Sequence, residues 1–222
     1  MDKLNSAAER RSFFREVRKR LFSGRLNRRQ VEGTDAILDG WAALTEDGRR
    51  AAGGDDALAY MLATAFHETA ATMQPVRETQ AASNAEAIAR LERAFAMGRL
   101  ATVKTPYWRS DAQGRTWLGR GLVQLTHRRN YEAMSALIGI DLVSEPDLAM
   151  EMGVAVKILI GGMRAGTFTG RRLGDYFAGG KADWIGARKI INGTDRAELV
   201  AGFAQAFRLA LPPCIDAGRG AC

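Results

Sequence analysis

Two glutamates lie on either side of a predicted helix end, within residues 65–79. The residue before a proline avoids helical dihedral angles, so Pro75 predicts that the preceding helix ends at about Gln74. Glu68 then projects from the helix, and Glu78 follows on a loop where it is free to face Glu68. Two carboxylates in different surroundings are what a general acid and a general base require.

The predicted helix places Glu68 near Met61, Thr64 and Ala65, one and two turns earlier. This stripe is largely apolar, and desolvation there disfavours the charged carboxylate, which suits a proton donor at neutral pH. The simplest alternative is a pair of ordinary surface glutamates. His67 points about 100° away around the helix, and a hydrogen-bonded core histidine fits it as well as a catalytic one.

A second segment, WLGRGLVQLTHRRNY at residues 117–131, combines close-approach glycines with polar side chains. Alternation over Leu122–Thr126 predicts a strand with Gln124 and Thr126 on one face and the apolar residues between them toward the core. A third segment, ARKIINGTD, places Asn192 before a glycine, which is typical of a helix end.

Taken together and in this order, these segments resemble the family 19 glycoside hydrolases, which include plant-type chitinases and many bacteriophage endolysins. The resemblance covers roughly residues 57–211. It is carried by HET at 67–69, by GRGLVQLT at 119–126 followed by NY at 130–131, and by ING at 191–193.

The resemblance implies an inverting hydrolase of β-1,4-linked N-acetylated glycans. Glu68 is then the general acid and Glu78 the general base, and Thr126 holds the attacking water together with Glu78. The implied reaction needs no cofactor. Only two histidines occur in the chain, which poorly supplies a catalytic zinc site, so no metal is expected. The expected substrate-binding residues are His67, Trp117, Gln124, Asn130, Tyr131 and Asn192.

Three departures separate this sequence from the plant enzymes. Leu118 replaces a tyrosine, the residues after Asn192 lack the plant glutamate and cysteine, and the spacing between the two glutamates is short. Short spacing implies that the loops of a long chitin groove are missing. The sequence therefore favours a peptidoglycan-degrading endolysin of the lysozyme type, with a chitinase as the alternative.

The composition of the 222 residues, 46% of them hydrophobic, predicts one good-sized core without a dividing linker. Runs of helix-forming residues predict a mainly α, single-domain, lysozyme-like fold with a small β or extended segment beside the cleft. The expected layout is one catalytic domain over residues 1–222. Its N-terminal helical part, 1–50, packs on a family 19-like core, 57–211, and the tail, 212–222, is loose.

Helix boundaries follow from capping residues. Ser6 is predicted to cap a first helix that ends at about Phe22, Asn27 to open a second, and Asp55 or Asp56 to cap the helix that carries Glu68. A last amphipathic helix is predicted over Asp195–Leu211. Its expected buried face is Leu199, Phe203, Ala206 and Leu209.

The net charge of +7 favours a polyanionic partner, and the first helix is rimmed by arginines. We interpret this surface as a contact with the anionic cell envelope. The rival readings are a basic nucleic-acid-binding protein, which lacks a recognised binding motif, and a catalytically inactive glycan-binding relative. No transmembrane segment or signal peptide is recognised, so we expect a monomer made in the cytoplasm and released to the wall by holin-type export. Whether Cys214 and Cys222 are bridged is left open.

Overall fold

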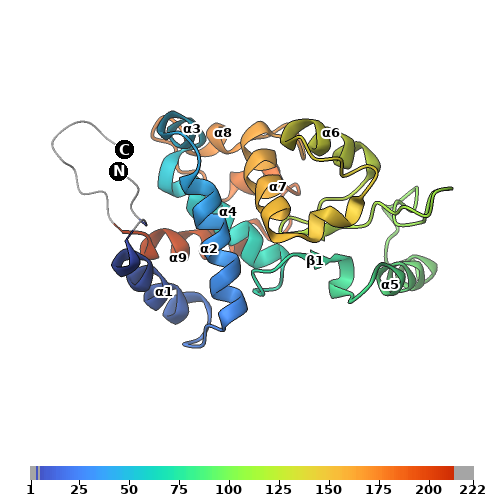
Figure 1. Cartoon of the computed structure of the whole chain (residues 1–222), viewed down its shortest axis with the longest axis horizontal. Coiled ribbons are helices and arrows are strands. Elements are labelled where there is room, and N and C mark those ends of the chain that lie inside the picture. Colours follow the sequence, from blue (N-terminus) through green and yellow to red (C-terminus); the bar gives the residue numbers. More distant parts are fainter. Residues whose placement is uncertain (1–3, 5, 213–222) are drawn as a thin grey trace.

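A computed structural model describes residue 4 and residues 6–212 of the chain. Helices dominate it, and two short strands form an antiparallel pair (Figure 1). The elements in chain order are α1 (Ala7–Leu21), α2 (Arg28–Ala42), α3 (Glu46–Ala52), α4 (Gly54–Glu68), β1 (Val76–Arg77), the 3₁₀ turn η1 (Glu78–Gln80), α5 (Asn84–Ala96), β2 (Arg120–Gly121), α6 (Arg128–Ile138), η2 (Pro146–Met150), α7 (Met152–Ala165), α8 (Leu173–Phe177), η3 (Gly186–Ile190) and α9 (Ala197–Ala210). The predicted mainly α fold class is confirmed. Cys214, Cys222 and most of the predicted tail lie outside the described residues.

Helix α4 is the centre of the larger part of the molecule. Every residue from Ala57 to Phe66 is buried, as expected for a helix that is apolar on all sides. It packs most extensively on α9 and also contacts α2, α3, α7 and α8. This packing fixes the direction in which the helix delivers Glu68 at its last turn.

The first two helices begin where their caps predict. The Ser6 side chain accepts a hydrogen bond from the Glu9 backbone, and Asn27 accepts one from Gln30 in the same way. In both helices the cap's own backbone amide donates to the side chain of that third residue, Glu9 or Gln30. Two otherwise free backbone donors are thus satisfied at each helix start. Helix α1 packs on α9, and α2 packs on α7 and α4.

Both predicted ends of the Glu68 helix were wrong. The helix is preceded by the additional short helix α3 and begins after Gly53, whose φ of 112° joins the two, so neither Asp55 nor Asp56 caps it. It ends at Glu68 and not near Gln74. The cause is Thr69, whose hydroxyl donates to the Ala65 carbonyl and accepts from the Met73 amide, turning the chain six residues before the proline.

The strand pair supports Glu78. Val76 pairs with Gly121 and Arg77 pairs with Arg120. The predicted strand over Leu122–Thr126 is instead a tight turn, in which Gln124 has a φ of 53° and the Leu125 amide donates back to the Arg120 carbonyl at 2.9 Å. The alternation reflects burial on the two sides of this turn and not an extended strand.

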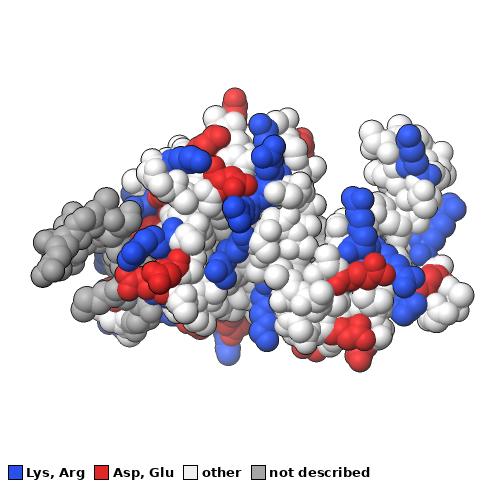
Figure 2. Space-filling model, turned by 90° about the horizontal axis from the view of Figure 1, so that it is seen from above, with Lys and Arg blue, Asp and Glu red and all other residues white. Residues whose placement is uncertain are grey.

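The hydrophobic residues form two clusters where the composition predicted one core. The smaller cluster lies under α5 and the loop that follows it, and contains Ala81, Ala87, Leu91, Trp108 and Leu118. Figure 1 places α5 at one end of the molecule, and Figure 2 shows the surface hollowed between the body and the lobe at that end.

The buried face of α9 also differs from the prediction. Leu199 and Leu209 are 43% and 67% exposed, whereas Val200, Ala204 and Phe207 are buried. Phe203 and Ala206 are half-buried, and the Phe203 ring packs on Phe66 of α4 with the centroids 4.8 Å apart, so the predicted face is right in part and the buried centre lies beside it. No helix among residues 6–212 is both long enough and apolar enough to cross a bilayer.

Candidate active site

Glu78 is held by donors on both of its carboxylate oxygens. The Gly119 amide donates to Oε2 at 2.8 Å, and the Tyr107 hydroxyl donates to Oε1 at 2.6 Å. The Glu78 amide in turn donates to the Gly119 carbonyl at 2.7 Å, which locks the start of η1 against the GRG segment. Donors of this kind stabilise the charged carboxylate and fix its orientation.

Gly119 is the point on which the polar side chains of this segment converge. A Cβ at this position would lie 2.7 Å from Gln124 Oε1, 3.2 Å from Thr126 Cγ2 and 3.3 Å from Glu78 Oε2. Only glycine leaves room for all three. The structure therefore brings Glu78, Gln124 and Thr126 together. The side-chain amide of Gln124 donates a hydrogen bond to the Val76 carbonyl at 3.0 Å.

The phenol of Tyr107 is also part of this group. Its ring packs against His127, with the ring centroids 4.3 Å apart. Burial and the neighbouring Glu78 carboxylate raise the pKa of Tyr107, so its hydroxyl stays protonated and donates. Burial, reinforced by Arg129, lowers the pKa of His127, so this imidazole favours the neutral form.

Glu68 forms a second group, built around a buried arginine. Arg188 Nη1 lies 2.6 Å from Glu68 Oε1, and the two side chains are 3% and 15% exposed. Arg188 Nε also donates to the Asp195 carbonyl at 2.9 Å, which anchors the guanidinium. The apolar stripe expected around Glu68 is thus incomplete, because η3 brings a cation to the carboxylate.

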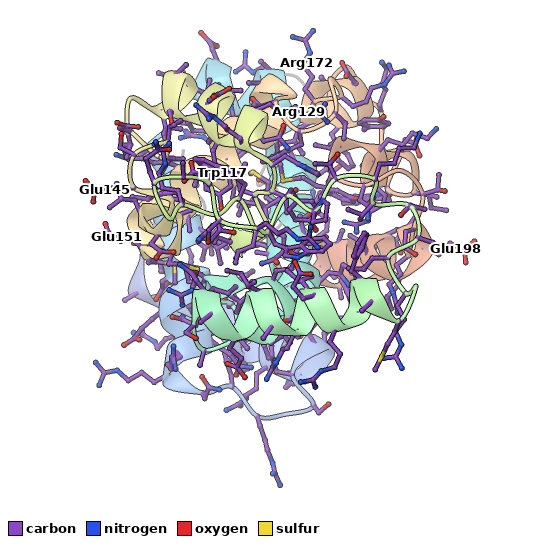
Figure 3. The ribbon with its side chains drawn as sticks, turned by 90° about the vertical axis from the view of Figure 1, so that its right-hand side faces the viewer. Trp117, Arg129, Glu145, Glu151, Arg172 and Glu198 are labelled. Atoms are coloured by element: carbon purple, nitrogen blue, oxygen red, sulfur yellow. The ribbon has the colours of Figure 1, made fainter. Side chains whose placement is uncertain are left out.

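Two predicted substrate-binding residues, Trp117 and Tyr131, are buried. Trp117 is 6% exposed, and its ring packs on Tyr131 with the centroids 5.4 Å apart, so it does not offer an open face to a sugar. Figure 3 shows Trp117 within the ribbon, whereas Arg172 and Glu198 project from it.

Tyr131 is fully buried, and its hydroxyl donates to the Leu118 carbonyl at 2.8 Å and accepts from Arg120 Nη1 at 2.9 Å. Burial raises the pKa of Tyr131 to about 12. Arg120, itself 1% exposed, pairs with Asp147 at 2.7 Å. Tyr131 and Arg120 therefore hold the GRG segment in place through buried hydrogen bonds.

The other predicted binding residues remain accessible to different degrees. Asn192 is exposed, and its backbone amide donates to the Arg188 carbonyl at 3.0 Å, which places it on the Glu68 side. Asn130 and His67 are half-buried. Burial lowers the pKa of His67, with Glu68 opposing and Arg188 adding to the effect. Their roles in substrate binding stay predictions.

Sequence reasoning missed Arg188 and Tyr107. One arginine among 32 basic residues carries no local signal, and its pairing with Glu68 spans 120 positions of the chain. Tyr107 lies outside the helices and strands, and no local pattern links it to Glu78. Its neighbour Trp108 is fully buried. Within residues 6–212, no three His, Cys, Asp or Glu side chains gather as a metal ion would need.

The site thus holds two separately supported carboxylates, one of them beside a threonine and an amide side chain, an arrangement that suits acid and base catalysis of glycoside hydrolysis. The family model described as Chitinase class I, glycoside hydrolase family 19, matches residues 35–161, which is more than half of the chain. The chain belongs to this family and is a glycosidase, which confirms the resemblance read from its motifs. The match ends before Arg188 and Asn192.

Two solved structures are similar to the chain. A crystal structure of a chitinase C mutant is 17% identical, with 90% of this chain and 91% of that chain covered and a TM-score of 0.44. A bacterial family 19 chitinase is 18% identical, with 89% and 93% covered and a TM-score of 0.41. No curated protein matches the chain.

Proposed function

We propose that the chain hydrolyses β-1,4-linked N-acetylated glycans with inversion, with Glu68 as the general acid and Glu78 as the general base. The contrast between the two carboxylates carries this proposal. Glu78 accepts hydrogen bonds on both oxygens, at 2.6 and 2.8 Å, which suits a group that must stay charged until it takes a proton from water. Glu68 ends a buried helix, and its side chain is 15% exposed and paired with Arg188.

The proposed reaction is a single displacement. Glu78 and Thr126 hold a water, Glu78 accepts its proton as the oxygen attacks the anomeric carbon, and Glu68 gives a proton to the leaving oxygen. Proton NMR of a chito-oligosaccharide digest tests this directly. The first product signal should come from the inverted anomer, and a retained anomer would refute the single displacement.

Peptidoglycan is the substrate that we favour, which makes the protein an endolysin of the lysozyme type. The short connection between the two glutamates and the positive charge support this choice. A chitinase is the second candidate, because the family model carries that description. Parallel digestion of purified peptidoglycan and colloidal chitin, with mass spectrometry of the new reducing ends, separates the two. New ends from chitin alone would reject the endolysin.

A basic surface on α1 supports attachment to an anionic wall polymer. We call Arg11, Arg15 and Arg18 the α1 basic face; all three are exposed. Arg15 lies 3.8 Å from Glu16, whereas Arg11 and Arg18 have no ion pair with any described residue. Arg18 also borders an open hollow of about 500 Å³, together with Arg25 and the start of α2.

Figure 2 shows Lys and Arg side chains spread among Asp and Glu on another side of the body. Exposed charges more than a Debye length apart are screened, and this length falls from about 10 Å at 0.1 M salt to about 3 Å at 1 M. Wall binding should therefore weaken with salt, while cleavage of a short neutral oligosaccharide should not.

The test reverses the charge of the α1 basic face and of a matched control set. Changing Arg11, Arg15 and Arg18 to Glu should lower wall binding and leave oligosaccharide cleavage intact. The control changes three exposed basic residues elsewhere in the chain, Arg93 on α5, Lys157 on α7 and Arg171 between α7 and α8, with the same change in net charge. Equal losses in both variants would show that only the overall charge matters.

Cellular release is part of the same proposal. An endolysin of this kind is made in the cytoplasm and reaches the wall after holin-type export, where it acts as a monomer. Expression in a bacterial host with and without a co-expressed holin tests the route. Lysis that does not depend on the holin would reject it.

A further inference from the structure

The turn directly after Glu78 has a backbone conformation that its residues disfavour. Thr79 and Gln80 have φ angles of 62° and 57°, in the left-handed region. Only glycine adopts this region without a steric cost, and a β-branched residue such as threonine is rarely found there. Such a conformation persists only where its surroundings hold it. Both residues are exposed, so the hold must act on the backbone of the turn.

Arg90 of α5 supplies that hold. Its Nη1 donates to the Thr79 carbonyl at 2.7 Å, and its Nη2 donates to Glu86 Oε1 at 2.6 Å. The other Glu86 oxygen accepts a hydrogen bond from the Ala82 amide at 2.8 Å. The Arg90–Glu86 pair therefore bonds to the chain on both sides of Gln80. A guanidinium is planar and its donors are fixed relative to each other, so the two bonds of Arg90 together set the position of the Thr79 carbonyl.

The helix that carries Arg90 is itself anchored. Its first residue, Asn84, accepts a hydrogen bond from Arg77 Nε at 2.8 Å and donates to Asp147 Oδ2 at 2.9 Å. These contacts tie the start of α5 to β1 and to η2. Arg90 thus holds the turn from a support that is fastened to the strand next to Glu78.

Glu78 lies between two backbone contacts. On its N-terminal side, its own amide donates to the Gly119 carbonyl at 2.7 Å. On its C-terminal side, the carbonyl of Thr79 is held by Arg90. If Thr79 relaxed to a negative φ, the chain on one side of it would rotate against the chain on the other, and the Glu78 carboxylate would shift. Misplacement of a catalytic group by about 1 Å can cost about 100-fold in rate, so a small shift is enough to lower activity.

We propose that Arg90 is a positioning residue whose hydrogen bond to the Thr79 carbonyl keeps the turn in its left-handed conformation and so keeps Glu78 aimed at the attacking water. No covalent bond forms or breaks in this role, and Arg90 acts through the backbone that follows Glu78. This inference rests on the proposed role of Glu78 as the general base.

The first test measures kcat and KM separately on a short chito-oligosaccharide. Arg90→Ala should lower kcat about tenfold, the loss of one charge-assisted hydrogen bond, and leave KM within about twofold of the wild type. The Arg90 side chain is 45% exposed, so its truncation leaves no cavity in the core. Arg93→Ala, which removes an exposed arginine from the same helix, is the control and should keep the wild-type kcat. Equal losses in the two variants would overturn the inference.

A second substitution asks whether the backbone of the turn is the cause. Thr79→Gly allows a positive φ without the steric cost. Added to Arg90→Ala, it should recover about three- to tenfold in kcat, whereas alone it should change kcat by less than about twofold, because Arg90 still holds the turn. A general loosening of α5 would not be repaired by a glycine at this position, so an absence of recovery would also count against the inference.

A measurement without substrate separates this inference from the proposed function. Three-bond NMR couplings report the φ angle of Thr79, which should be positive in the wild type and in Arg93→Ala and largely negative in Arg90→Ala. A negative φ in the wild type, or a positive φ retained in Arg90→Ala, would refute the hold on the turn. A φ that changes sign in Arg90→Ala, in a protein whose wild type cleaves no glycan, would uphold that hold and reject the proposed function.

Discussion

Replacing Tyr107 by phenylalanine removes one of the two donors that hold Glu78 and changes little else. The hydroxyl lies 2.6 Å from Glu78 Oε1, and the Gly119 amide remains on the other oxygen at 2.8 Å. The ring contacts with Trp108, at 5.0 Å, and His127, at 4.3 Å, do not involve the hydroxyl and should persist. The substitution therefore isolates one hydrogen bond to the proposed base.

The size of the effect follows from that contact. A hydrogen bond to a charged group contributes about 1.5–3 kcal/mol, and the lower end applies because Glu78 is only half-buried. A difference of about 1.4 kcal/mol is a factor of ten in rate. The Tyr107 hydroxyl fixes one oxygen of the Glu78 carboxylate, so its loss should lower kcat about tenfold and leave KM nearly unchanged.

The assay measures kcat and KM separately with a short chito-oligosaccharide. His127 touches Tyr107, so His127→Asn, alone and combined with Tyr107→Phe, separates the effect of the hydroxyl from that of the ring contact. A kcat within about twofold of the wild type would refute the reasoning, because it would mean that the hydroxyl does not hold Glu78 for catalysis.

Glu68→Gln should lower kcat by about 100-fold or more and should also lower the melting temperature, because the buried Arg188 loses its ion-pair partner; near wild-type turnover would place the acid elsewhere. Thr126→Ala, which removes one proposed hydrogen bond to the water, should cost roughly two- to tenfold. Tyr131→Phe should lower the free energy of unfolding by about 1–3 kcal/mol in urea and leave KM unchanged, and a raised KM at unchanged stability would restore it as a binding residue. Gly33→Ala should destabilise by roughly 1–3 kcal/mol, because the added Cβ would lie 1.7 Å from the Met73 carbonyl oxygen; an unchanged denaturation midpoint would contradict this close approach.

The sequence alone determined the local features of the protein. The caps at Ser6 and Asn27 bond to residues three positions away, so the local sequence is enough to predict them. The burial of α4 follows from an apolar surface on all sides. The motifs identified the family and placed Gln124 and Thr126 on the same side as each other, even though the segment turns where a strand was predicted.

Only the tertiary structure decided what surrounds the two carboxylates. Arg188 reaches Glu68 across 120 positions because η3 packs against α8 and α9, and no local pattern encodes that approach. Tyr107 meets Glu78 because a loop closes over the smaller hydrophobic cluster. Trp117 is of a residue type that often stacks on sugars, yet the residues around it bury its ring. Residue types and spacing define which chemistry is possible, whereas burial and long-range partners, which depend on how distant segments pack, decide which residues carry it out.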